Sequence, residues 1–136
     1  MKVAELFENY ERSILSVFGK QLDKVNKSLH YEGYRLDSLE GVPSSIGINL
    51  YCSNNNFTSL HNIHKKIKYT GGLASFNKCP ITSHVLGLLL IDGLQQVYLD
   101  TNGVEDIINK HLKGDRDVFA CQEELIEAGY EECAQL

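Results

Sequence analysis

Short runs in which hydrophobic and polar residues alternate recur along the middle of the chain, and the clearest covers residues 50–60, LYCSNNNFTSL. Leu50 and Cys52 are two positions apart, so on a β-strand both side chains point to the same side, toward a core. Asn55 comes where the chain has to turn, and its side-chain amide can bind backbone groups that no ladder reaches. Phe57 and Leu60 then bring the chain back over the core. The run therefore predicts a short strand followed by a turn.

The same frame of positions occurs three more times, which predicts a stack of parallel strands. The four frames begin at Leu29, Leu50, Ala74 and Val97. Their turn positions hold Tyr34, Asn55, Cys79 and Asn102. The hydrophobic residues that follow are Leu36, Phe57, Ile81 and Val104, which are 21, 24 and 23 residues apart. One such unit cannot bury its own apolar side, so each unit needs a neighbour. A small α+β domain with unrelated short strands is the alternative interpretation.

Helical spacing of hydrophobic residues predicts helices before this region. Residues 2–18 carry one apolar stripe, and a second helix is predicted over 20–28 with Leu22 and Val25 turned inward. A solenoid end exposes an apolar cross-section, so these helices are candidates for a cap. The same stripe could instead pair with a second copy of the chain, which leaves a homodimer open.

Helices are also predicted within and after the repeats. Residues 82–90 are apolar enough for a largely buried helix, and another helix follows Val104 and ends at Gly114. Asp117 is a candidate N-cap for a helix over 118–128, with Gly129 as its stop. In that last helix, the positions predicted to face inward are Phe119, Cys121 or Gln122, Leu125 and Ile126.

The predicted fold class is α/β, with about four parallel strands capped by helices at both ends. Its length of 136 residues indicates a single domain over 1–136. Within it, residues 1–28 form the helical N-terminal cap, 29–104 the repeat region and 105–136 the helical C-terminal cap.

Composition and charge argue against a nucleic-acid-binding, secreted or membrane-spanning protein. The formal net charge is -5, which argues against nucleic acid as a partner because nucleic-acid binding needs a basic surface. The N-terminus has no apolar signal segment, and the longest apolar run, 85–91, is too short to span a bilayer. The four cysteines form no C-x-x-C pair and are expected to stay reduced. These features predict a cytoplasmic protein without a membrane partner.

The repeat frame L-x-C-x-x-N-x-F-x-x-L resembles the leucine-rich repeat, L-x-L-x-x-N/C-x-L-x-x-L. The run LDSLEGVPSSIGINLYCSNNNFTSL is similar to the short bacterial-type repeat of effector-type proteins. Combined with the tail DVFACQEELIEAGYEECAQL, it resembles small uncharacterised proteins of tailed bacteriophages. The resemblance implies a short leucine-rich-repeat solenoid and a viral accessory protein that acts in the cytoplasm of the host bacterium.

Side chains that alternate with the core residues are predicted to line one open face of the stacked strands. This surface is polar and mildly acidic, and it carries two tyrosines, which suit macromolecular recognition. Ordinary solvated strand residues are the alternative interpretation. The predicted partner-binding residues are His30, Glu32, Tyr51, Ser53, Asn54, Ser75, Asn77, Lys78, Tyr98 and Asp100.

Other chemistry-bearing residues give weaker signals. His61 and His64 lack two further zinc ligands, so no metal site is predicted, and they are interpreted as part of a basic surface cluster with Lys65, Lys66 and Lys68. Cys121 near a helix N-terminus could form a nucleophilic site with His111 and Asp115, although neighbouring Glu123 and Glu124 oppose a thiolate. No phosphate-binding, dinucleotide-binding or G-x-S-x-G motif occurs in the sequence.

These observations predict a non-enzymatic protein–protein interaction module that needs no cofactor. It would bind a host bacterial protein, such as a defence protein, and inhibit or redirect it by steric blocking. The alternative is a small enzyme, or a binder of a small molecule or nucleotide, with a pocket between the sheet and the C-terminal helices.

Overall fold

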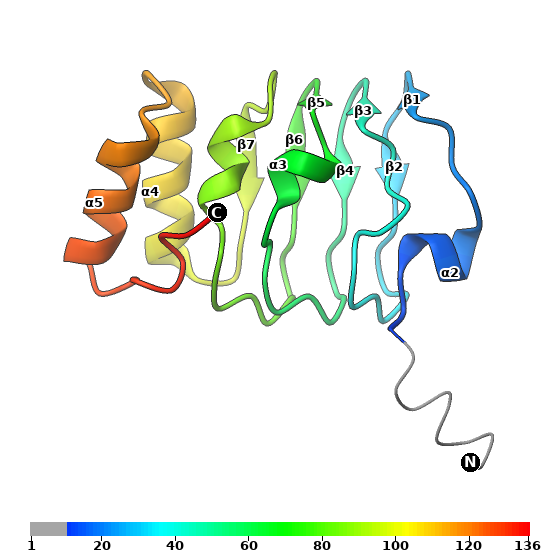
Figure 1. Cartoon of the computed structure of the whole chain (residues 1–136), viewed down its shortest axis with the longest axis horizontal. Helices are drawn as coiled ribbons and strands as arrows, with labels where there is room; N and C mark the ends of the chain where they lie inside the picture. The colour runs from blue at the N-terminus through cyan, green and yellow to red at the C-terminus, as the bar shows by residue number, and fades with distance from the viewer. Residues whose placement is uncertain (1–10) are drawn as a thin grey trace, which may run out of the picture.

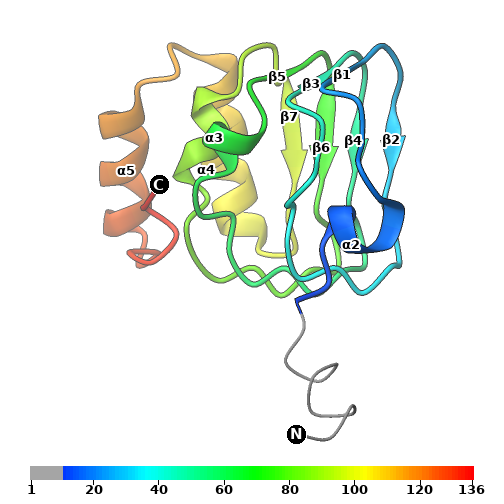
Figure 2. The ribbon, with the colours of Figure 1, turned by 45° about the vertical axis from the view of Figure 1, so that its right-hand side comes forward.

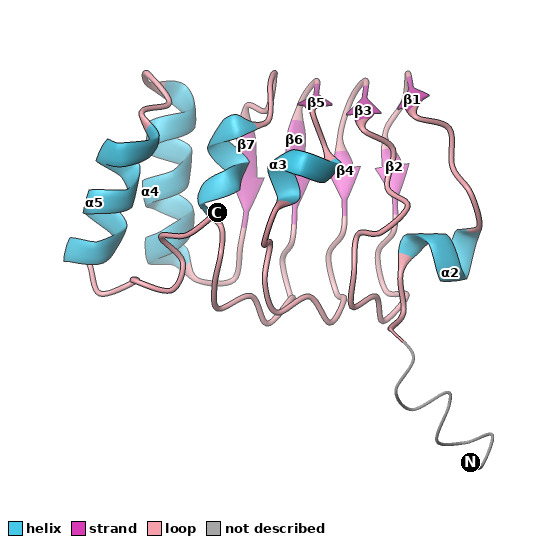
Figure 3. Ribbon diagram, viewed as in Figure 1, coloured by secondary structure: helices cyan, strands magenta, loops and turns pink. Residues whose placement is uncertain are grey.

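Two parallel β-sheets run through the part of the chain that the computed structural model describes, residues 11–136 (Figure 1; Figure 3). The larger sheet has the strand order β2-β4-β6-β7, and the smaller sheet has the order β1-β3-β5. The strands are β1 (Lys24–Val25), β2 (Leu29–His30), β3 (Ser45–Ile46), β4 (Leu50–Tyr51), β5 (Tyr69–Thr70), β6 (Leu73–Ser75) and β7 (Gln96–Tyr98). The helices are α2 (Ile14–Phe18), α3 (Ile63–Lys66), the 3-10 helix η1 (Leu86–Leu90), α4 (Asn102–Lys113) and α5 (Val118–Glu127).

The larger sheet confirms the strand register predicted from the repeat frames. Its first positions pair in the order Leu29, Leu50, Ala74 and Val97, all in parallel. Leu50 is 1% exposed and Cys52 is fully buried, whereas Tyr51 between them is half-buried. The alternation of residue types thus decides which side chains reach the core. Figure 2 shows these strands side by side in chain order.

The smaller sheet replaces a helix that the sequence predicted. Residues 20–28 are not helical, because Val25 of β1 pairs with Ile46 of β3 instead. Leu22, predicted to face inward, is 74% exposed. Gly19, at a φ of +75°, ends the preceding helix, and the chain then extends into the ladder.

The segments that return the chain behind the larger sheet differ in length. Leu36 and Ser45 are 9 positions apart, whereas the equivalent Phe57 and Tyr69 are 12 positions apart. The longer return contains the single helical turn α3. The helix predicted over 82–90 is shorter than expected and is the 3-10 helix η1, with four of its five residues buried.

Asn55 occupies the turn as predicted and is only 3% exposed. Its Nδ2 donates to the carbonyl oxygens of Tyr31 and Cys52, both at 2.9 Å. Its Oδ1 accepts from the backbone N–H groups of Leu36 at 2.9 Å and Tyr34 at 3.2 Å. One side chain therefore provides the backbone hydrogen bonds that neither ladder supplies at this corner.

The other turn positions depart from this arrangement. Buried Cys79 makes a weaker version, with its Sγ donating to the carbonyl oxygen of Cys52 at 3.3 Å. Tyr34 is 41% exposed and stacks edge-on against Phe18, with ring centroids 4.6 Å apart. Asn102 is exposed and is the first residue of α4, so its predicted corner role is wrong.

Helix α4 covers the outer edge of β7. The Asn109 side chain accepts from the Val97 backbone N–H at 2.8 Å and donates to the Val97 carbonyl oxygen at 2.9 Å. Glu105 accepts from the backbone N–H of Leu99 at 2.7 Å. These side chains stand in for a further strand, while the buried residues Val104, Ile108 and Leu112 extend the core.

Helix α5 begins and ends as predicted. The Asp117 carboxylate accepts from the Ala120 backbone N–H at 3.1 Å, and Gly129 follows the helix with a φ of +91°. Its buried residues are Cys121 and Leu125. Phe119 and Ile126 were predicted to face inward, but they are 80% and 45% exposed. Only a narrow stripe of α5 contacts the rest of the domain.

The predicted N-terminal helix over 2–18 is only partly open to comparison, because residues 2–10 lie outside the described residues. Within the described chain, the helix is α2, which begins at Ile14. Ser13 and Ser16 cap it reciprocally through their hydroxyl groups and backbone N–H groups. Arg12 and Ser13 also run parallel to the segment at Ser38. This segment therefore covers one part of the N-terminal edge.

Candidate functional site

The strand register places the predicted partner-binding residues in rows across one face of the larger sheet. We call this surface the front face. His30, Tyr51, Ser75 and Tyr98 occupy equivalent positions of four adjacent strands. Residues 32–33, 53–54, 77–78 and 100–101 follow these strands and continue the face, since each strand lies parallel to the next.

An aromatic pair marks one side of the front face. The rings of His30 and Tyr51 are stacked, with centroids 4.8 Å apart and an interplanar angle of 17°. The Tyr51 hydroxyl accepts from Asn49 Nδ2 at 2.9 Å, and His30 Nδ1 lies 3.3 Å from the Glu32 carboxylate. These contacts hold the aromatic rings in place before any partner arrives, which lowers the entropic cost of binding.

Small hydroxyl side chains separate this pair from Tyr98. Ser75 lies between Tyr51 and Tyr98 in the register and is 7% exposed. Its Oγ is 2.7 Å from the Oγ of Ser53, so the two hydroxyl groups satisfy each other. Because adjacent strands lie about 4.8 Å apart, the two tyrosines flank a serine-lined strip roughly 10 Å wide.

Backbone N–H groups connect the residues that follow the strands on the front face. Asn54 donates its backbone N–H to the Asn77 carbonyl oxygen at 2.8 Å. The Lys78 backbone N–H donates to Asp100 Oδ1 at 2.7 Å. Asn54 and Lys78 both have a φ of +58°, so the turn repeats in adjacent coils. The Lys78 side chain is exposed on the same face as the acidic residues Asp100 and Glu32. The charges on this face are therefore mixed, with a small acidic excess.

The nucleophilic site considered from the sequence is not activated. Cys121 is fully buried, and burial, followed by the nearby Glu124 carboxylate, raises the pKa of its thiol to about 11. The expected lowering of the pKa by a helix N-terminus is therefore wrong. His111 Nε2 lies 3.1 Å from Glu124 Oε1, and Asp115 is exposed. At neutral pH this thiol is protonated, which is the unreactive form.

A cleft beside β7 and α4 is the place where the sequence allowed a pocket between the sheet and the C-terminal helices. It is lined by Gln95, Gln96, Leu112, Lys113 and Arg116, so neither Cys121 nor His111 reaches it. Arg116 donates to the carbonyl oxygens of Ile91 and Leu94 and holds the α4–α5 connection against the preceding loop. Four of its five lining residues are polar or charged.

His64 in α3 and His61, which precedes that helix, have different surroundings. His64 Nδ1 is buried against η1 without a hydrogen-bond partner among the described residues. Burial and the charges of Lys65, Lys68 and His61 lower the pKa of His64. His61 instead packs edge-on against His84, with ring centroids 4.8 Å apart. Across residues 11–136, no three His, Cys, Asp or Glu side chains are grouped as metal ligands would be.

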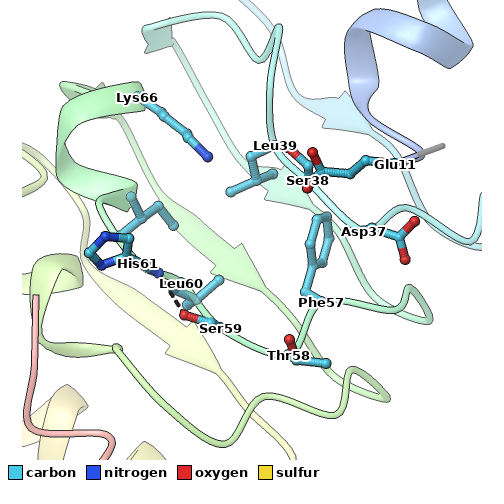
Figure 4. Close-up of a pocket in the computed structure, with 11 residues that line it drawn as sticks. Glu11, Asp37, Ser38, Leu39, Phe57, Thr58, Ser59, Leu60, His61 and Lys66 are labelled. Atoms are coloured by element: carbon cyan, nitrogen blue, oxygen red, sulfur yellow. Dashed lines mark hydrogen bonds between the residues drawn. The ribbon is translucent and has the colours of Figure 1, made fainter. Parts of the chain in front are cut away.

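Sequence reasoning missed a cleft behind the sheets, which we call the return cleft (Figure 4). It measures about 270 Å³ and lies between the return segments 37–39 and 57–66. Lys66 and Asp37 line it together with hydroxyl groups and the Phe57 ring. The signal was present in the unequal spacing of the repeats, because the three additional residues lie in the second return segment.

Within residues 11–136, no helix combines the length and the apolar character that crossing a bilayer requires. Comparison of the chain with protein-family models, with curated protein sequences and with solved structures gives no significant match.

Proposed function

We propose that the chain is a short leucine-rich-repeat solenoid that acts as a protein–protein interaction module through its front face. The observation that carries this proposal is the solvent-accessible row of aromatic side chains, His30, Tyr51 and Tyr98, on an open parallel sheet, in which the His30 and Tyr51 rings are stacked. Tyrosine side chains provide large contact areas at a low entropic cost, and they are common among the residues that dominate interface affinity.

The strand register and the corner hydrogen bonds support the repeat assignment. The equivalent residues of the four frames pair in register, and Asn55 makes the corner hydrogen bonds that this repeat position requires. The edge of β7 is covered by α4, so the sheet does not continue by pairing there. Repeats of this kind present extended faces to other macromolecules.

The class of partner is inferred from the resemblance of the sequence to small phage proteins. We propose that the protein acts in the cytoplasm of an infected bacterium, where it docks on a host protein and inhibits or redirects it by steric blocking. The mixed charges of Glu32, Lys78 and Asp100 suit a polar protein surface. No catalytic step is required of the front face in this proposal.

The proposal is tested by capture experiments with the full chain and bacterial lysate. The wild-type chain is expected to retain a defined host protein, identified by mass spectrometry. The double variant Tyr51→Ala, Tyr98→Ala removes both aromatic anchors and is expected to weaken capture by about thirtyfold or more, since truncating even one hot-spot residue costs about 2 kcal/mol or more.

A matched control removes an exposed aromatic ring elsewhere. Phe119 is 80% exposed on α5, away from the front face, so Phe119→Ala should leave capture unchanged. Equal capture by the double variant and the wild-type chain would eliminate the front face as the contact site. A wild-type chain that retains nothing beyond a tag-only control would contradict the interaction module itself.

A further inference from the structure

A depression lies at the corner that follows β2, and we call it the arginine depression. It measures about 280 Å³ and is lined by Arg12, Gly33, Tyr34 and Arg35. Residues 33–35 belong to the corner itself, whereas Arg12 reaches it from the segment that precedes α2. Two arginine side chains that are 23 positions apart in the sequence thus line the same space.

Hydrogen bonds hold the Arg12 side chain against the corner. Its Nε donates to the Tyr34 carbonyl oxygen at 2.9 Å, and its backbone N–H donates to Asp37 Oδ2 at 3.0 Å. The Tyr34 backbone N–H in turn donates to Asn55 Oδ1 at 3.2 Å. The two Nη atoms of Arg12 make no hydrogen bond to other residues within 11–136. The guanidinium group is therefore oriented while four of its five N–H donors remain available to a ligand.

Arg35 has a backbone conformation that arginine rarely adopts. Its φ is +56°, in the left-handed region, whereas the equivalent residues of the next two frames, Asn56 and Pro80, do not have a positive φ. Arg116 has a similar φ of +55°, but its guanidinium group donates to two backbone carbonyl oxygens. No hydrogen bond among the described residues involves the Arg35 side chain. Such strain without a structural use of the side chain points to a role in binding.

The carboxylates near this corner are engaged elsewhere. Glu32 lies 3.3 Å from His30, and Asp37 accepts the backbone N–H of Arg12. Neither carboxylate lines the depression. None of the ion pairs found within residues 11–136 involves Arg12 or Arg35. The depression therefore carries two positive charges on a chain whose formal net charge is -5.

Two guanidinium groups at one depression favour an anion with two charges. Guanidinium groups pair bidentately with phosphate and carboxylate oxygens. A phosphate monoester carries a charge of about −1.5 to −2 at pH 7 and offers three acceptor oxygens, whereas a carboxylate carries a single charge. The Tyr34 ring lines the same depression and is 41% exposed, so it adds apolar surface for an aromatic group of the ligand.

We propose that the arginine depression binds an aryl phosphate, the chemistry of the phosphotyrosine side chain. Arg12 and Arg35 pair with the phosphate oxygens, and the Tyr34 ring contacts the aromatic ring of the ligand. This site does not depend on the proposed function of the front face, because none of these three side chains belongs to the predicted partner-binding residues.

The experiment is a titration of the full chain, labelled with ¹⁵N, with phenyl phosphate, followed by the backbone amide signals. Saturable shifts are expected at Arg12 and at residues 33–35. Benzoate carries one charge instead of about two and should bind about tenfold more weakly. Methyl phosphate lacks the ring and should bind about fivefold more weakly. In adenosine 5′-monophosphate a ribose separates ring and phosphate, so it should bind no better than methyl phosphate.

Substitutions of single charges test the residue roles. Asparagine tolerates a left-handed backbone, so Arg35→Asn should keep the corner intact and weaken phenyl phosphate binding by about tenfold. Arg12→Gln, whose amide can still donate to the Tyr34 carbonyl oxygen, should have a similar effect. Lys27→Asn removes the same charge from the exposed turn between β1 and β2 and should leave binding unchanged.

The proposal is overturned if phenyl phosphate causes no saturable shifts at these amides, or if Lys27→Asn weakens binding as much as Arg35→Asn does. Equal binding of benzoate and phenyl phosphate would exclude recognition of a dianion. Equal binding of methyl phosphate, or tighter binding of adenosine 5′-monophosphate, would exclude an aryl phosphate as the ligand.

Discussion

Asn55 connects two successive turns of the chain through a single buried amide group. Its four principal hydrogen bonds all reach backbone atoms. Three of them are in the segment after β2, at Tyr31, Tyr34 and Leu36, and one is in its own turn, at Cys52. A shorter or apolar side chain cannot replace them, because each lost bond would leave a backbone group buried without a partner. Cys79 fills the equivalent place with only a weak thiol donor.

We expect Asn55→Ala to lower the free energy of unfolding by about 3 kcal/mol, since it leaves several backbone groups unsatisfied. Urea denaturation followed by circular dichroism measures this change. The neighbouring Asn56 is exposed, so Asn56→Ala should change stability by less than about 0.5 kcal/mol. Equal effects of the two substitutions would show that the buried amide has no special role.

At the residue scale, the sequence was most informative where the chemistry of a side chain permits only one kind of position in the fold. The buried positions Leu50 and Cys52 and the corner role of Asn55 could be predicted, because alternation and amide chemistry permit few alternatives. Phe119 was misplaced for the opposite reason. Helix α5 buries only Cys121 and Leu125, so a stripe that narrow does not show which further apolar residues face inward.

Helix α4 closes the C-terminal edge of the larger sheet by side-chain mimicry of a strand. Asn109 binds both the N–H and the carbonyl group of Val97, and Glu105 binds the N–H of Leu99. An open edge at this position would present unpaired backbone groups that promote association with other strands. The helix thus contributes polar protection as well as apolar burial.

We expect Asn109→Ala to destabilise the protein by about 2 kcal/mol and to accelerate hydrogen exchange at the Val97 amide. Asp106 is exposed on the same helix, so Asp106→Ala is the matched control and should alter neither quantity. Nuclear magnetic resonance exchange rates provide the measurement. Unchanged protection of Val97 in the Asn109 variant would refute the capping role.

Element prediction depended on how much pattern each segment contains. Helix α4 and the strands of the larger sheet have repeating apolar positions, and they were predicted. Strands β1, β3 and β5 lie outside the repeat frames, so no repeating apolar position in the sequence indicates them. A helix was therefore wrongly predicted over 20–28. Leu22 and Val25 fit a helical spacing by chance, but pairing with β3 determines the structure of this segment.

The whole domain keeps its four cysteines as buried thiols. Burial is the largest cause of the raised pKa values of Cys52, Cys79, Cys121 and Cys133, and in all four neighbouring groups reinforce or partly offset it. A raised pKa in the folded state means that the unfolded chain loses these protons first as the pH rises. Folding stability is therefore fully present below the thiol pKa of the unfolded chain, about 9, and decreases above it.

We expect the free energy of unfolding to decrease between pH 9 and about 11, because the pKa of Cys121 is about 11 when folded. Cys121→Ala should be less stable at pH 7 but should lose about 2 kcal/mol less over this interval. Denaturation under reducing conditions at several pH values measures both slopes. If the free energy of unfolding falls equally with pH in the variant and the wild-type chain, ionisation of this thiol does not cause the loss of stability at high pH.

At the scale of the molecule, the front face could be predicted, whereas the sequence spacing indicated only that the return segments differ in length and not that a cleft lies between them. Strand pairing places Tyr51 and Tyr98 on one surface wherever the repeat frame holds, so their positions follow from sequence spacing. The cleft depends on how two unequal return segments pack, and no periodic pattern describes that packing. Its residues Asp37 and Lys66 are 29 positions apart and belong to no shared motif.

The unequal return segments have a consequence for how such a domain can diversify. The pairing of β2, β4 and β6 keeps its alignment although the loops behind these strands differ by three residues. Chain length is thus adjustable on the rear of the molecule and constrained on its front. Insertions and deletions could reshape the return cleft on one side while the opposite surface keeps its geometry, so the two surfaces are free to evolve separately.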